Sequence, residues 1–279
     1  MNDRHSTVDI DEIVRQGLAY TCFQPLISVR RQEITGFEAL GRGFHPITGA
    51  TIPPDRLFGE AKRRGLTLEL DRLLRGKALE EFSRQAGAGA HYILSLNIAT
   101  SILGQAGGSG HLLSSVLKSG LEPGRVMIEI LESEIDDTGA LLDFVQTYRD
   151  RGFLIALDDI GSGFSNLDRI SMIKPDVLKL DKSLLDSIET EYHARVVIRS
   201  LIGMAHATGS LVIAEGVETE GQAMILLESG ADMLQGYYFA RPSESIASAE
   251  TRVNALKRSV SASLTRLLID KVERRRLRH

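Results

Sequence analysis

Short apolar segments alternate with amphipathic stretches along most of the chain. The segments that predict strands are Tyr20–Ile27, Glu33–Arg42, Tyr92–Ile98, Arg125–Leu131, Phe153–Asp158, Asp176–Leu180, Leu211–Glu215 and Met233–Phe239. Helical periodicity between them predicts helices within Leu57–Ser83, Leu141–Arg151 and Ser187–Gly209. Nearly continuous apolar strands that alternate with helices are typical of a parallel sheet covered by helices.

The number and spacing of the predicted strands favour an α/β barrel. Roughly eight strands over about 235 residues suit a (β/α)8 TIM-like barrel, a fold that takes about 250 residues. An open, doubly wound sheet is the alternative. Only a few residues separate the first two strands, which is too short for a parallel crossover. We therefore expect these two strands to form a hairpin, so that the barrel departs from the standard pattern at its start.

Polar side chains interrupt the apolar strands near their ends. They are Glu38, Asn97, Glu129, Asp158 with Asp159, Lys179, Glu215 and Gln235. The carboxyl ends of parallel strands in a barrel converge on one face, where active sites of this fold are built. One such residue alone is more often a rim, capping or ion-pair residue. The interpretation therefore depends on the whole set, to which nearly every strand contributes.

The carboxylates of this set would repel one another strongly if they shared one small bowl. Two divalent cations together with Lys179 would balance the five negative charges, which come from Glu38, Glu129, Asp158, Asp159 and Glu215. Carboxylate and amide oxygens suit Mg²⁺ or Mn²⁺ better than zinc. Two ions about 3.5–4 Å apart are an arrangement used for in-line attack on a phosphodiester. From the residues alone, a metal site and a ring of structural ion pairs both stay open.

Composition and charge narrow the class of protein. The 279 residues carry a formal net charge of -4 and 5% aromatic residues, with no Trp, so we expect no DNA or RNA polymer as a partner. Cys22 is the single cysteine, which excludes an intrachain disulfide and a zinc site built from several cysteines. A polar N-terminus and the lack of eighteen consecutive apolar residues predict neither a secretory signal nor a membrane span. We expect a cytoplasmic protein.

The chain divides into three predicted parts: a lead-in helix in residues 1–17, one barrel domain in residues 18–245, and a basic amphipathic helix or tail in residues 246–279. Residues 252–278 of this tail hold nine Lys or Arg and two acidic residues. Apolar residues recur there at helical spacing. A terminal helix laid on the barrel, a helix that docks on a partner and a membrane-surface contact are the alternatives for this segment.

An ordered series of motifs resembles the EAL domain family, the cyclic-di-GMP phosphodiesterases, over residues 18–242. The motifs are Gln24-Pro25-Leu26, Glu38-Ala39-Leu40 with Arg42, Asn97 within SLNIA, Glu129-Ile130-Leu131-Glu132, Asp158-Asp159, Lys179-Leu180-Asp181, Glu215-Gly216-Val217-Glu218 and Gln235-Gly236-Tyr237. The resemblance implies a (β/α)8 TIM-like barrel with an antiparallel first strand. It also implies hydrolysis of cyclic-di-GMP to linear pGpG by a two-metal mechanism.

The resemblance assigns expected roles to residues of this chain. The expected ligands of Mg²⁺ or Mn²⁺ are Glu38, Asn97, Glu129 and Asp158 for one ion, and Asp158, Asp159 and Glu215 for the second. Catalytic roles fall to Lys179, which would orient the metal-site water, and also to Glu215, Gln235 and Glu132, of which Glu132 would anchor the loop after Asp159. Substrate contacts fall to Gln24, Leu40 and Arg42.

Two other functions stay open for the same barrel. One is a catalytically silent receptor that binds cyclic-di-GMP and signals through protein contacts. The other is a barrel enzyme that acts on a different phosphodiester. The resemblance further implies a homodimer, and we expect the signal that sets activity to come from a regulatory protein partner or from assembly.

Overall fold

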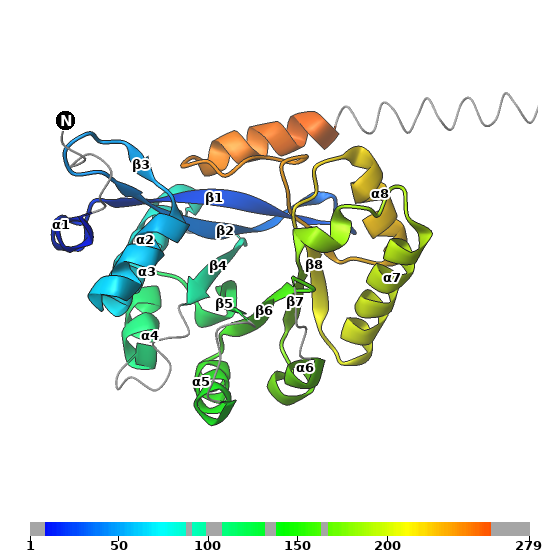
Figure 1. Cartoon of the computed structure of the whole chain (residues 1–279), viewed down its shortest axis with the longest axis horizontal. Coiled ribbons are helices and arrows are strands. Elements are labelled where there is room, and N and C mark those ends of the chain that lie inside the picture. The colour runs from blue at the N-terminus through cyan, green and yellow to red at the C-terminus, as the bar shows by residue number, and fades with distance from the viewer. Residues whose placement is uncertain (1–8, 88–90, 99–107, 132–137, 163–166, 258–279) are drawn as a thin grey trace, which may run out of the picture.

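A computed structural model of the chain describes residues 9–87, 91–98, 108–131, 138–162 and 167–257. Its strands are β1 Ala19–Ser28, β2 Glu33–Phe44, β3 Thr51–Ile52, β4 Ile93–Ile98, β5 Val126–Leu131, β6 Leu154–Ile160, β7 Val177–Leu180, β8 Leu211–Ala214 and β9 Met233–Leu234. Its helices are α1 Ile10–Gln16, α2 Pro54–Arg64, α3 Thr67–Ala86, α4 Gly108–Lys118, α5 Thr138–Asp150, α6 Leu167–Ile173, α7 Tyr192–Ala207 and α8 Glu220–Ser229, with short 3₁₀ turns at Pro123–Arg125 and Lys182–Leu185. Figure 1 shows the helices arranged around the outside of the sheet.

The sheet closes into the predicted barrel. Neighbouring strands follow the order β1-β9-β8-β7-β6-β5-β4-β2-β3. An additional pairing between β1 and β2 closes the sheet into a barrel. The pairs from β2–β4 through β8–β9 are parallel, whereas β1 is antiparallel to both β2 and β9. The short connection between Ser28 and Glu33 explains this reversal, because it permits only a hairpin. The antiparallel first strand is therefore confirmed.

Two predicted elements differ from the structure. The predicted helical stretch Leu57–Ser83 is divided between α2 and α3, because α2 ends at Gly65, whose φ of 71° is left-handed and whose N–H donates to the Ala61 and Lys62 carbonyls. The last predicted strand, Met233–Phe239, stops at Leu234. Beyond it the chain turns back on the loop after β8, since Val217 N–H donates to Gln235 O and Tyr238 N–H donates to Val217 O.

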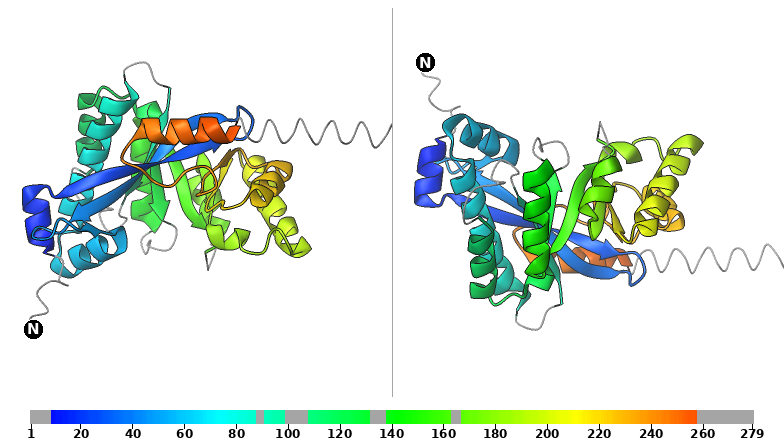
Figure 2. Two further views of the ribbon diagram at one scale, coloured as in Figure 1. Left: turned by 90° about the horizontal axis from the view of Figure 1, so that it is seen from above. Right: turned by 90° about the horizontal axis from the view of Figure 1, so that it is seen from below.

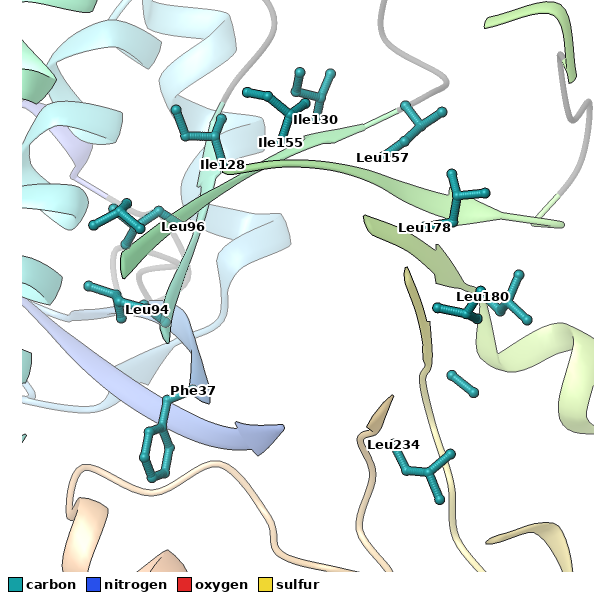
Figure 3. Close-up of a cluster of buried hydrophobic side chains, with 14 of the residues drawn as sticks. Phe37, Leu94, Leu96, Ile128, Ile130, Ile155, Leu157, Leu178, Leu180 and Leu234 are labelled. Carbon is teal, nitrogen blue, oxygen red and sulfur yellow. The ribbon is translucent and has the colours of Figure 1, made fainter. Parts of the chain in front are cut away.

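Alternation along each strand separates two apolar layers. Side chains such as Leu94, Ile128 and Leu178 belong to the large core between the barrel and its helices. Figure 3 shows the labelled members of this core following the curve of the sheet from β2 to β7, with Leu234 on β9. The inward positions form a second, smaller cluster of Leu26, Met127, Ala156, Val177, Ile213 and Met233. This inner cluster fills the barrel below the polar residues of its carboxyl end, as side chains of this fold do.

The segment after the barrel returns to the first hairpin. Residues 246–257 are helical, and Figures 1 and 2 show this helix alongside β1. Ile246, Ala249 and Val253 join the outer core, and Tyr92 donates a hydrogen bond to Glu250. A helix laid on the barrel is thus what the structure shows for this part of the tail. The strongly basic part, residues 258–279, lies outside the described residues. Within the described ranges, we find no helix long and apolar enough to cross a membrane.

The first parallel pairing leaves no room for a side chain at one position of β2. Gly36 pairs with Ile93, and a Cβ at Gly36 would meet the Ile93 carbonyl oxygen at 2.5 Å. Gly36→Ala is therefore expected to lower the free energy of unfolding in urea by about 1–3 kcal/mol, because the backbone must shift. Gly59→Ala is the control, since a Cβ there meets nothing within 4 Å and a helix gains up to about 1 kcal/mol. Equal stability of the two variants would contradict this packing argument.

Candidate active site

Lys179 lies at the centre of the polar residues that the barrel gathers. Its side chain comes from β7 and is 1% exposed. The Nζ atom lies 2.7 Å from Glu215 Oε1, 2.9 Å from Glu129 Oε1, 3.1 Å from Asp158 Oδ2 and 3.9 Å from Glu38 Oε1. These carboxylates come from four different elements, namely β2, β5, β6 and the residue after β8. The predicted residues Glu38, Glu129, Asp158 and Glu215 therefore converge around one ammonium group inside the barrel.

Amide side chains hold Glu38 from two sides. Asn97 Nδ2 donates to Glu38 Oε1 at 3.0 Å, and Gln235 Nε2 donates to Glu38 Oε2 at 2.6 Å. The Gln235 amide also lies 3.2 Å from Gln24 Oε1, and Gln24 in turn donates to the Ala240 carbonyl at 3.3 Å. The network runs from β4 across β2 to the segment after β9. It brings Gln24, Glu38, Asn97 and Gln235 together in one place.

The adjacent aspartates at the end of β6 occupy different environments. Asp158 is buried and Asp159 is half-buried, and the Asp159 N–H donates to Asp158 Oδ1 at 2.9 Å. Asp159 has a φ of 60°, in the left-handed region that Asp tolerates better than most residues. Carboxylate oxygens of Asp158, Asp159 and Glu215 all lie within 4.8 Å of one another. This spacing suits oxygen ligands that share a divalent cation.

Burial and mutual repulsion shift the pKa values of these acids. Burial, followed by the charge of Glu38, raises the pKa of Glu129 well above its usual value. Burial raises the pKa of Glu215 to about 8, although Lys179 opposes this shift. Burial and the neighbouring Asp158 raise the pKa of Asp159 to about 6. Burial alone would lower the pKa of Lys179, but the surrounding carboxylates, Glu129 foremost, raise it well above its usual value.

The oxygen donors present fit divalent cations. Four carboxyl groups lie within 4.0 Å of one ammonium group in the described part of this site, and Asp159 adds a fifth beside Asp158 and Glu215. The raised pKa values of Glu129, Asp159 and Glu215 show that one ammonium group does not supply enough positive charge to keep all five acids ionised. Within the same residues, Glu129 Oε2 is buried and accepts no hydrogen bond. Leaving a buried carboxylate oxygen unpartnered is costly, which is unusual unless a ligand occupies it. Hard oxygen ligands of this kind suit Mg²⁺ or Mn²⁺.

Two cavities flank the carboxyl end of β2. One, of about 440 Å³, is lined by Glu38, Leu40, Arg42 and Asn97, with apolar residues of α3 and β4 along its wall. The other, of about 280 Å³, is lined by Gln24, Glu38, Leu40, Glu215 and Gln235. Glu38 and Leu40 line both cavities, so the polar centre lies between them. The predicted substrate contacts Gln24, Leu40 and Arg42 therefore all border this space.

Three residues at or beside the site, Ser95, Asp71 and Arg75, were not predicted from the sequence. Ser95 is buried beside Glu129, and its position two residues before Asn97 on the same strand was the available signal. Asp71 and Arg75 form a buried ion pair on α3 that lines the larger cavity, and their i,i+4 spacing within an apolar helix face was the signal. Glu132 lies outside the described residues, so its loop-anchoring role stays a prediction.

Removing the central ammonium group should destabilise the barrel. In EDTA, we expect Lys179→Met to lower the free energy of unfolding by about 3–5 kcal/mol, because buried carboxylates lose their counter-charge. Urea unfolding followed by circular dichroism measures this change. Lys182→Met is the matched control, since its 3.4 Å ion pair with Glu218 is exposed and should contribute at most about 1 kcal/mol. A loss for Lys179→Met no larger than that of the control would contradict the central role of this group.

The chain is similar in sequence to longer proteins from several bacteria. The chain is 32% identical over 225 residues to the signaling protein YkoW of Bacillus subtilis, a match that covers 79% of this chain and 28% of YkoW. It is 29% identical over 238 residues to the cyclic di-GMP phosphodiesterase RocR of Pseudomonas aeruginosa, covering 85% of this chain and 60% of RocR. The chain thus spans less than two thirds of the length of either relative.

Solved structures agree with the fold. An EAL domain protein from Listeria monocytogenes EGD-e superimposes with a TM-score of 0.76 at 26% identity, covering 88% of this chain and 96% of that one. The manganese and cyclic-di-GMP complex of BlrP1 from Klebsiella pneumoniae has a TM-score of 0.74 at 26% identity, covering 82% of this chain and 57% of that one. A sequence model of the EAL domain matches residues 8–242. The chain therefore belongs to the EAL domain family.

Proposed function

We propose that this chain hydrolyses one phosphodiester bond of cyclic-di-GMP to give linear pGpG, with two divalent cations, Mg²⁺ or Mn²⁺. The observation that carries the proposal is the convergence of Glu38, Glu129, Asp158 and Glu215 on Lys179 with an unpartnered Glu129 oxygen beside them. The similarity to RocR, a cyclic di-GMP phosphodiesterase, supports the proposed reaction. The similarity to BlrP1, solved as a complex with manganese and cyclic-di-GMP, supports the proposed cofactor and substrate.

The metal ligands in this proposal are the oxygen donors of the barrel mouth. Glu38, Asn97, Glu129 and Asp158 would hold one ion, and Asp158, Asp159 and Glu215 the other. When bound, such ions lower the pKa of a water molecule and stabilise the charge that develops on a phosphoryl group. The ligands keep their arrangement because Lys179 and the amides of Asn97 and Gln235 already hold the carboxylates in place.

The remaining residues of the chain position the water and the substrate. Lys179 supplies a fixed positive charge, and Gln235 offers amide atoms at the same place. Arg42 borders the larger cavity and would pair with a substrate phosphate, while Gln24 and Leu40 border the path between the two cavities. In the reaction, the water oxygen bonds to phosphorus, the bond from phosphorus to the 3′ oxygen breaks, and a proton ends on that leaving oxygen. No nucleophilic side chain is needed.

Assembly, location and regulation complete the proposal. We propose a cytoplasmic homodimer whose activity is set by a regulatory protein partner or by assembly. The resemblance described above supports the dimer, and Glu132 is proposed to anchor the loop that follows Asp159. The basic residues 258–279 are proposed as a further contact surface.

The first test is incubation of the purified chain with cyclic-di-GMP and Mg²⁺, followed by chromatography of the products. We expect pGpG in Mg²⁺ or Mn²⁺ and none in EDTA. Asp159→Asn should lower kcat by more than about 100-fold, equivalent to about 2.7 kcal/mol, while Asp143→Asn, an exposed position on α5, should not. Binding without any pGpG would favour the receptor function, and equal competition by cyclic-di-AMP would favour a different phosphodiester substrate.

The role of Arg42 is tested by the kinetics of its alanine variant. A lost charge-assisted hydrogen bond is worth about 1.5–3 kcal/mol, so Arg42→Ala should raise KM for cyclic-di-GMP by roughly 10-fold or more. Arg30→Ala, an exposed arginine in the turn between β1 and β2, should leave KM unchanged. A normal KM for Arg42→Ala would remove Arg42 from the substrate contacts while leaving the metal assignment intact.

A further inference from the structure

The two oxygens of Glu129 are not equivalent. Oε1 accepts a hydrogen bond from Ser95 Oγ at 2.5 Å and lies 2.9 Å from Lys179 Nζ. Oε2 is buried and accepts no hydrogen bond from the residues that the structure describes. Ser95 and Lys179 therefore both contact Oε1, whereas no donor among the described residues reaches Oε2. Another polar neighbour of this carboxyl group is Glu38, and the hydrogen bond between the two acids helps to lower the pKa of Glu38. Rotation about the terminal bond of the Glu129 side chain would exchange Oε1 and Oε2. A neighbouring group must therefore hold the carboxylate in one orientation.

Lys179 does not decide between these oxygens by itself. Its Nζ atom contacts the same Oε1 at 2.9 Å, but it also lies within 4.0 Å of three other carboxylates and is therefore shared among four acids. An ammonium group is also a compact charge on a flexible stem. Ser95 differs, because its hydroxyl has a single proton and therefore donates one hydrogen bond, which goes to Glu129 Oε1.

The fold fixes Ser95 in this place. On β4, Ser95 pairs in register with Glu38 of β2 and with Met127 of β5. Its side chain is fully buried and faces the barrel interior, on the same side as Asn97 two residues later. Met127 belongs to the apolar cluster that fills the barrel below. A small hydroxyl between an apolar floor and a ring of acids is held without freedom to turn toward solvent.

We propose that Ser95 is a positioning residue for the metal ligand Glu129: its hydroxyl holds Oε1 and thereby presents Oε2 to the divalent cation. The inference rests on the proposed function and deepens it. Hydrogen bonds that orient a metal ligand in this way typically contribute 10–100-fold to metal affinity. Ser95 itself touches neither the ion nor the substrate, so its contribution is to the affinity and geometry of the site.

The test is titration of the metal-free chain with Mn²⁺ in the absence of substrate, followed by isothermal calorimetry or by the electron paramagnetic resonance of free Mn²⁺. Ser95→Ala should bind at least one Mn²⁺ about 10–100-fold more weakly than the parent. Ser210→Ala is the matched control, because Ser210 is 2% exposed and donates to Pro175 O at 2.6 Å at the far end of the barrel. Urea unfolding in EDTA confirms that both variants are folded.

Turnover gives a second readout. If Ser95 acts through Glu129, the activity lost in Ser95→Ala should return as Mn²⁺ is raised, whereas a general packing defect would lower activity equally at every Mn²⁺ concentration. Affinity of Ser95→Ala within twofold of the parent, or a loss that Mn²⁺ does not reverse, would overturn the assignment of Ser95 alone. A parent chain that binds no Mn²⁺ would overturn the proposed function and this inference together.

Discussion

The ammonium group of Lys179, buried among four carboxylates, is the interaction on which the barrel mouth depends. Each carboxylate buried without it would carry a desolvation cost that no nearby cation offsets within the described residues. Because the four acids come from β2, β5, β6 and the residue after β8, their common partner links these elements at the carboxyl end of the barrel. One contact therefore supplies a counter-charge to acids from four different elements of the barrel.

This contact leaves the site short of positive charge, which is a property suited to a ligand-binding centre. A purely structural ion pair tends to match its charges one to one, as the buried Asp71–Arg75 pair on α3 does. Around Lys179 the acids outnumber the cation, and burial has raised the pKa values of Glu129 and Glu215. Divalent cations would reduce the repulsion between the acids and would give the unpartnered Glu129 oxygen a partner. The apolar cluster inside the barrel lies below the site and limits the access of water from that side.

Much of this arrangement could be predicted from the sequence because strand periodicity states which side chains face inward. Glu129 between Ile128 and Ile130, and Lys179 between Leu178 and Leu180, are polar residues that only an interior polar site explains well. The break at Gly65 and the early end of β9 depend on local turn geometry and on the distant Val217, which periodicity does not encode. Ser95 could not be predicted, because a serine within an apolar strand is common and its partner Glu129 lies on another strand.

The closure of the barrel by β1 carries a consequence for how the chain folds. In the described structure β1 meets β9 through two residue pairs, Ile27–Leu234 and Ser28–Met233, which are about two hundred positions apart. Pairings this distant repay their loop-closure entropy only when the intervening helices and strands are already formed. The hydrogen bond from Gln235 to Glu38 spans the same seam. The polar centre should therefore be among the last parts of the barrel to assemble, because its residues come together only after the chain through Gln235 has left the ribosome.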